Sequence, residues 1–206
     1  MIAHDRPHCA RRNRGFSLIE ILVTIALITL GILGVFGLQS RAANIELESY
    51  QRSQALSLAR EMESVLRASR ALHSNFSAPA LSSTDGSVYV GVGGNVTCST
   101  PAADAAEAAM CSWGEALQGA SLAGSSTLGG MIGARGCVIR PASPQAGALA
   151  DFYVVVVWQG IAPSNEPPAT SLASTCFSGT GLGFADGLRR GLTLRVLVPK
   201  LASTSP

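Results

Sequence analysis

One acidic residue lies inside an apolar segment, where a charge is not expected. Glu20 is the fifth residue of the stretch 16–38, which is otherwise apolar. An ionised carboxylate in lipid or in an apolar helix bundle is costly unless a cation lies beside it. The sequence therefore predicts a partner cation for Glu20.

A second set of residues with possible chemistry consists of four cysteines that follow the apolar stretch, whereas Cys9 precedes it. Successive members are separated by 12, 25 and 38 residues, too far apart for the close cysteine pairs of structural zinc sites. In an oxidising compartment, an even number of cysteines favours disulfides over metal binding or free thiols. Three pairings are possible, and the sequence alone does not choose among them. The four are Cys98, Cys111, Cys137 and Cys176.

The apolar stretch itself is predicted to cross a membrane once. Residues 16–38 contain a single charge, and a helix of this length covers the roughly 30 Å hydrocarbon core of a bilayer. Residues 1–15 carry four arginines and one aspartate, and basic residues beside an apolar span stay on the cytoplasmic side. We therefore expect the C-terminus on the periplasmic side. No basic stripe with interleaved aromatics follows, so nucleic-acid binding is not favoured.

The helix is predicted to continue beyond the span, from about residue 17 to about residue 72. No proline or glycine occurs in 39–72, and small or apolar residues recur there at three- and four-residue steps. We expect this amphipathic half of the helix to pack on the rest of the chain through a stripe of Ala55, Leu58, Ala59, Met62, Val65, Leu66 and Ser69.

Residues 73–206 are predicted to form a globular domain with one further helix and a small sheet. The segment 102–118 is typical of a helix with Met110, Trp113 and Leu117 on one side, and the glycine-rich segment 119–136 is typical of a loop. A long irregular stretch is expected at 160–187. Predicted strands cover 87–92, 137–140, 152–159 and 192–198. The expected fold class is α+β, with a long N-terminal helix on an antiparallel sheet of three or four strands.

These elements favour one of the three disulfide pairings. Cys98 joined to Cys111 would bracket the start of the helix at 102–118, and Cys137 joined to Cys176 would tie the long irregular stretch to a strand. We therefore favour these two disulfides.

The string "GFSLIE" after a basic leader resembles the prepilin signal of type IV pilins and type II secretion pseudopilins. The resemblance implies that residues 1–15 are a leader, which a prepilin peptidase removes by cutting between Gly15 and Phe16. It also implies N-methylation of Phe16. In this family the acid that matches Glu20 pairs with the amino terminus of a neighbouring subunit, which would supply the expected cation.

The string "LGILGVFGLQ" resembles the corresponding end of the span in PilV-type minor pilins, the type IV pilus modification proteins. It contains Gly31, Gly34 and Gly37 and lacks the proline that major pilins typically carry near Gly37. A looser likeness extends over the C-terminal strands. This implies the type IV pilin fold and a minor pilin in the inner membrane that primes pilus assembly on the assembly platform. Its partners would be other minor pilins, the major pilin and a tip adhesin, and its final place would be the tip of the extracellular pilus.

Two other functions are compatible with the same sequence. One is a minor pseudopilin of a type II secretion system, and the other is a signal-anchored periplasmic binding domain that never polymerises. An enzyme is not expected, because His4, His8 and His73 are the only histidines and the carboxylates are scattered. The strings GVGGN and GTGLG lack the lysine of a phosphate loop, so no catalytic residue, cofactor or metal ion is expected.

Overall fold

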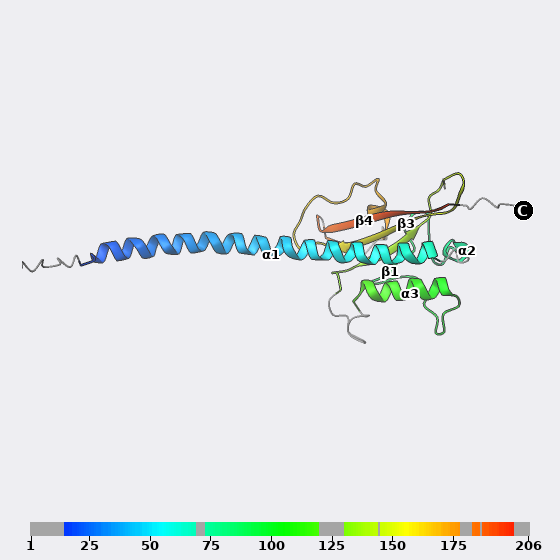
Figure 1. Cartoon of the computed structure of the whole chain (residues 1–206), viewed down its shortest axis with the longest axis horizontal. Coiled ribbons are helices and arrows are strands. Elements are labelled where there is room, and N and C mark those ends of the chain that lie inside the picture. The colour runs from blue at the N-terminus through cyan, green and yellow to red at the C-terminus, as the bar shows by residue number, and fades with distance from the viewer. Residues whose placement is uncertain are drawn as a thin grey trace, which may run out of the picture. The chain divides into compact units, whose positions relative to one another are not determined.

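The computed structural model describes residues 15–68, 73–119, 130–143, 145–177, 183–185 and 187–199. The chain divides into two compact units, Met1–Ala43 and Asn44–Pro206, and the first helix contributes residues to both. In chain order the elements are α1 (Leu18–Ala68), α2 (His73–Phe76), β1 (Val90–Gly91), α3 (Ala105–Leu117), β2 (Arg135–Ile139), β3 (Ala148–Gln159), α5 (Leu172–Thr175) and β4 (Arg189–Pro199) (Figure 1).

The four strands form one antiparallel sheet in the order β1-β2-β3-β4. This confirms the predicted α+β fold class, with a long N-terminal helix packed on a small antiparallel sheet. β3 is an interior strand, because Val155 pairs with Cys137 of β2 on one side and with Thr193 of β4 on the other. Both faces of β3 are also covered, because Val154 and Val155, which point to opposite faces, are each fully buried. This explains its run of β-branched and aromatic residues.

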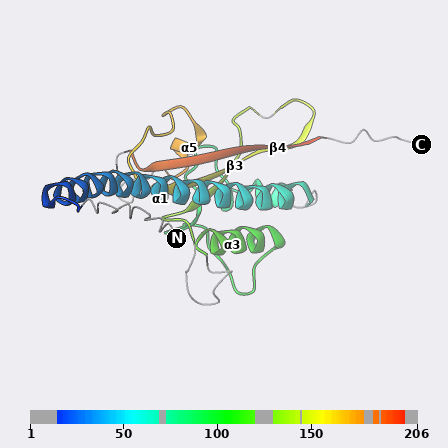
Figure 2. The same cartoon turned by 60° about the vertical axis from the view of Figure 1, so that its left-hand side comes forward.

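One face of the sheet packs against α1 and α3. Phe152, Val154, Val156 and Trp158 alternate along β3 and are all buried on this face. Figures 1 and 2 both show α3 running alongside the C-terminal half of α1. The two helices add buried residues to the same core: Ala55, Ala59, Met62 and Leu66 from α1, and Met110, Trp113 and Leu117 from α3. The predicted apolar sides of both helices are thus confirmed for these residues.

The opposite face of the sheet has a smaller core. Val155 and Val157 of β3 pack there with Ile139 of β2, under Ala173 of α5 and the adjoining Cys176. Every second residue of β3 therefore points to each core, as the two-residue period of a strand requires.

The described part of α1 ends at Ala68. The predicted end near residue 72 and Ser69 of the predicted stripe fall on residues 69–72, which lie outside the described residues. α3 begins at Ala105 rather than at residue 102. The reason is the cap, because the side chain of Asp104 accepts hydrogen bonds from Ala106 N and Glu107 N at 2.8 Å.

The strands also differ at their ends. β2 begins at Arg135, so the predicted loop is wrong at 135–136, and residues 120–129 of that loop lie outside the described residues. β3 and β4 are both longer than predicted. They pair with each other continuously from Gln159↔Arg189 to Ala148↔Pro199, apart from one irregularity near Ala148. β1 is reduced to Val90–Gly91, and the stretch 160–187 contains the short helix α5.

Candidate functional site

The N-terminal end of α1 contains the residues of the predicted prepilin signal. Gly15 and Phe16 immediately precede the helix. Ser17 O accepts hydrogen bonds from Glu20 N at 3.1 Å and from Ile21 N at 3.3 Å, which closes the first helical turn. Glu20 lies in that turn, where a negative charge interacts favourably with the helix dipole.

The apolar side chains of residues 16–38 are exposed all around the helix. The large hydrophobic residues in this stretch expose between 45% of their surface, at Ile21, and 81%, at Leu18. Among the described residues, α1 is the one helix long and apolar enough to cross a membrane, with a mean hydropathy of 2.6 over its most apolar window. A helix that is apolar on every side needs lipid or neighbouring helices around it.

Glu20 projects from this apolar surface without an ion-pair partner in the described part of the chain. The ion pairs found there involve other acids, namely Glu48, Glu63 and Asp151. The leader residues 1–14 lie outside the described residues. The partner cation of Glu20, the cut after Gly15 and the methylation of Phe16 therefore remain predictions.

The cysteines form the two disulfides that the sequence analysis favours. Cys98 is joined to Cys111, with a Cα–Cα distance of 5.8 Å, and this bond ties the segment before α3 to the helix near the surface. Cys137 is joined to Cys176, with a Cα–Cα distance of 5.9 Å, and both residues are fully buried. The second bond fastens the end of α5 to β2.

Two arginines surround the buried disulfide. Arg189 Nε donates to Ala173 O at 2.9 Å, and its Nη2 donates to Cys176 O. The guanidinium of Arg135 lies 3.7 Å from the centroid of the Phe177 ring, within cation–π distance. Burial lowers the pKa of both guanidinium groups, yet arginine remains charged at neutral pH. Arg189 therefore binds two carbonyl oxygens of the segment that ends at Cys176, next to the disulfide.

Arg190 connects three segments of the second unit. Its Nη2 lies 3.0 Å from Glu48 Oε1 on α1 and also donates to Ala162 O at 2.6 Å. Sequence reasoning missed this contact, because Glu48 and Arg190 are 142 residues apart and neither belongs to a motif.

A third charged contact lies between β3 and β4. Asp151 is buried and accepts hydrogen bonds from Arg195 Nε at 3.1 Å and Nη2 at 2.8 Å, and from Gln145 N at 3.0 Å. The hydrogen bonds from Arg195 lower the pKa of the Asp151 carboxyl group, against the opposing effect of its burial. No local sequence signal marks this pair either.

The described residues do not suggest a metal centre. Within them, no group of three or more histidine, cysteine, aspartate or glutamate side chains is arranged to hold a metal ion. The four cysteines after the span are held in disulfides, and Asp104 and Glu107 accept hydrogen bonds from backbone N–H groups around the start of α3.

Comparison with known proteins identifies the N-terminal segment. Residues 10–36 match the family described as the prokaryotic N-terminal methylation motif. Neither the curated proteins nor the solved structures contain a significant match to the chain. The matched segment includes Gly15, Phe16 and Glu20. This prepilin-type motif indicates a type IV pilin or pseudopilin, a structural subunit that prepilin peptidase processes for assembly into a pilus or a secretion system.

Proposed function

We propose that this chain is a PilV-type minor pilin that primes assembly of a type IV pilus. The observation that carries the proposal is the methylation motif at residues 10–36, which includes most of the exposed apolar stretch 16–38. The glycines Gly31, Gly34 and Gly37 and the absence of a proline near them support the minor-pilin branch. The alternative machine is a type II secretion system, in which the chain would be a minor pseudopilin.

In this proposal the chain passes through two states. Before assembly, residues 16–38 anchor it in the inner membrane, with residues 73–206 in the periplasm. Prepilin peptidase removes residues 1–15 and methylates the new amino terminus of Phe16. The subunit then joins other minor pilins, the major pilin and a tip adhesin, with Glu20 next to the amino terminus of a neighbour. The filament tip is its final location.

The pairing of Glu20 with an amine has a direct physical basis. Cleavage creates a new positive charge at Phe16, and each subunit in a helix bundle brings one such charge and one carboxylate. In an apolar surrounding an isolated charge is costly, whereas an adjacent pair of opposite charges is much less so. Only subunits that have been cut can satisfy Glu20 in this way, so processing becomes a requirement for assembly.

The mature amino terminus provides the first test. Intact-mass and N-terminal peptide analysis of the chain, purified from membranes, should give residues 16–206 with one methyl group on Phe16. A Gly15→Leu variant, with a bulky side chain at the cut, should retain the leader. Recovery of the wild-type chain with its leader attached would instead support a signal-anchored domain that does not polymerise.

Gene deletion and gene neighbourhood separate the two machines. Loss of the gene should reduce surface piliation and twitching, and complementation should restore both. Neighbouring genes for minor pilins and an adhesin would agree with the pilus. Neighbouring genes for a secretin and a secretion ATPase, together with unchanged piliation, would assign the chain to type II secretion.

A further inference from the structure

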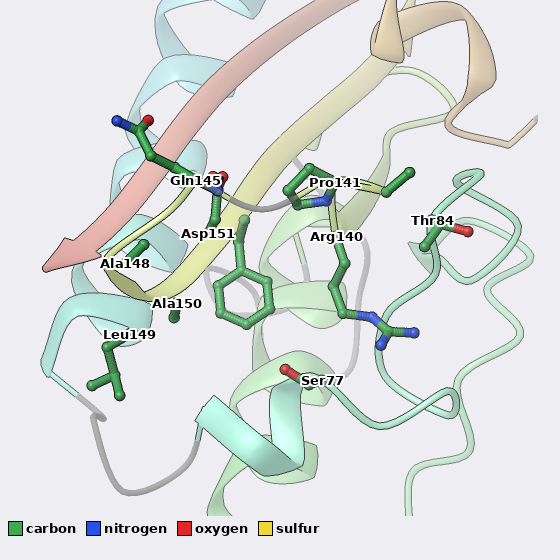
Figure 3. Close-up of a pocket in the computed structure, with 11 residues that line it drawn as sticks. Ser77, Thr84, Arg140, Pro141, Gln145, Ala148, Leu149, Ala150 and Asp151 are labelled. Atoms are coloured by element: carbon green, nitrogen blue, oxygen red, sulfur yellow. Dashed lines mark hydrogen bonds between the residues drawn. The ribbon is translucent and has the colours of Figure 1, made fainter. Parts of the chain in front are cut away.

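A pocket of about 440 Å³ lies between the segment after α2, the segment just after β2 and the first residues of β3 (Figure 3). Its volume falls within the range of small-ligand sites. The wall combines a cation and a hydroxyl group, from Arg140 and Thr84, with apolar surface from Pro141, Leu149 and Phe152. All of these residues belong to the second compact unit.

Arg140 lines this pocket without an acidic partner among the residues that the structure describes. Its backbone N donates to Ser83 O at 2.9 Å, which fixes the start of the side chain. Its Nε is buried and has no hydrogen-bond acceptor in the described part of the protein, and the ion pairs of that part do not include it. By contrast, Arg189, Arg190 and Arg195 all donate to protein oxygen atoms. A buried donor without an acceptor is unusual in folded proteins, and an acceptor oxygen from outside the chain would satisfy it.

The other charged residue of the pocket wall does not neutralise Arg140. Asp151 is occupied by Arg195 and by Gln145 N, with donor–acceptor distances of 2.8 to 3.1 Å. The pocket therefore keeps one uncompensated positive charge. A monoanion would balance this charge, whereas a dianion would leave a negative charge close to Asp151. The planar guanidinium matches the two oxygen atoms of a carboxylate in a fork geometry.

We propose that this pocket binds a carboxylate on a short apolar stem, with Arg140 as its cation and with Pro141, Leu149 and Phe152 around the stem. Such a group is present in free aliphatic acids and in the glutamate side chain of a peptide. Figure 3 shows the guanidinium of Arg140 extended from the end of β2, with Ser77 and Thr84 on either side of it in this view. The proposal does not depend on the assembly function, because it uses no residue of the prepilin signal.

The test is titration calorimetry on the full chain in neutral detergent, with sodium butyrate as the probe and butyramide as the uncharged control. Butyrate should bind saturably, with a dissociation constant of about 1 mM, as expected for one charged fork and a small apolar contact. Arg140→Gln should weaken binding about tenfold or more. Arg140→Lys keeps the charge but loses the fork, so it should fall between the wild type and Arg140→Gln. Arg60→Gln, at an exposed position of α1, should bind like the wild type.

A second titration separates the two sources of the carboxylate. The probe is the acetylated and amidated peptide Ala-Glu-Ala, with Ala-Gln-Ala as its control. Tighter binding of the glutamate peptide than of butyrate would identify a partner protein as the source, and equal or weaker binding would identify a free acid. Thermal melting monitored by circular dichroism establishes that each variant is folded. Undetectable binding of both probes, tighter binding of inorganic phosphate than of butyrate, or unchanged butyrate affinity in folded Arg140→Gln would each overturn the proposal.

Discussion

The carboxylates of Glu20 and Asp151 differ in their burial and in their hydrogen-bond partners. Asp151 is buried, yet it accepts three hydrogen bonds from Arg195 and Gln145. Glu20 is exposed, yet the surface around it is apolar and the described ion pairs do not include it. Carboxylates need donors or cations wherever water is excluded. Asp151 therefore stabilises the isolated domain, whereas the proposed function supplies the partner of Glu20 from a neighbouring subunit.

Replacing Glu20 by alanine should leave insertion and cleavage intact and impair assembly. The variant removes the charge that is proposed to pair with a neighbouring amino terminus, but it leaves the predicted cleavage site at Gly15 and Phe16 unchanged. The measurement is co-purification of the tagged variant with other subunits, with Glu46→Gln on the same helix as the control. Wild-type recovery of the complex with Glu20→Ala would show that the pairing role is wrong.

Replacing Asp151 by asparagine should destabilise the domain by about 1–3 kcal/mol, as expected for the loss of charge-assisted hydrogen bonds at a buried site. The loss is limited because the side chain of Arg195 remains 40% exposed and is solvated in the variant. Urea unfolding of the full chain in neutral detergent measures the change. Glu61→Gln, at an exposed position of α1, should change the free energy of unfolding by less than about 0.5 kcal/mol.

The Asp151 pair also predicts a loss of stability in acid. Arg195 holds the pKa of the folded Asp151 carboxyl group below its ordinary value of 3.8, which applies to the unfolded chain. The stabilisation is therefore complete above pH 3.8 and is lost as the pH falls through the lower, folded pKa. Unfolding measured from pH 6 to about pH 2 should show a smaller acid loss in Asp151→Asn than in the wild type. Equal acid sensitivity would contradict the role assigned to this pair.

At the scale of elements, the joint between α3 and β2 depends on a glycine. A Cβ atom at Gly136 would lie 2.3 Å from Cη2 of Trp113 and 2.8 Å from Cδ1 of Leu117. The ring of Trp113 is fixed in turn, because its Nε1 donates to Leu58 O on α1 at 2.9 Å. Because Gly136 has no side chain, α3 can pack closely on the sheet while Trp113 keeps its hydrogen bond to α1.

Replacing Gly136 by alanine should destabilise the protein by about 1–3 kcal/mol through overpacking. The indole ring cannot withdraw without losing its hydrogen bond to Leu58 and its burial. Gly183→Ala is the control, since no heavy atom of the described residues, its chain neighbours apart, lies within 4 Å of the added Cβ. Thermal melting should give a lower midpoint for Gly136→Ala and a nearly unchanged midpoint for Gly183→Ala. Equal midpoints for the two variants would disprove the close approach of Trp113.

At the scale of the whole molecule, the two disulfides stabilise the second unit to different extents. Cys137–Cys176 closes a span of 39 residues, and Cys98–Cys111 closes a span of 13. Chain entropy predicts stabilisation of about 4 kcal/mol for the longer loop and about 3 kcal/mol for the shorter one. The longer loop contains β3 and most of the stretch before β4. Its bond fastens the end of this loop to β2.

Replacing both cysteines of a pair by alanine tests this order. Cys137→Ala with Cys176→Ala should lose more stability than Cys98→Ala with Cys111→Ala, since it opens the longer loop and also leaves space in a fully buried site. Urea unfolding gives the difference, and non-reducing peptide mapping establishes that the remaining bond is intact. A greater loss from the surface pair would contradict this ranking.

Several features of this protein could be predicted because they depend on local patterns of residues in the sequence. The apolar span, the stripe from Ala55 to Leu66 and the buried run of β3 follow from helical and strand periods, and the fold class follows from their order. The favoured cysteine pairs agree with the structure: one brackets the start of a predicted helix, and the other ties the long irregular stretch to a predicted strand. The prepilin signal is a linear motif, so its residues needed no tertiary information.

The remaining features depend on residues that are brought together only by folding. Glu48 and Arg190 are 142 residues apart, and Asp151 and Arg195 are 44 apart, so no window of sequence contains either pair. The sequence placed Gly136 in a glycine-rich loop, but it pairs with Val90 of β1 and Val156 of β3, and the ring of Trp113 fills the space of its missing side chain. The sequence by itself determined the signal, the span and the fold class, because these depend on the order and period of side chains. Only the tertiary structure decided the strand ends, the ion pairs and the pocket of Arg140, because these depend on which distant atoms exclude water from one another.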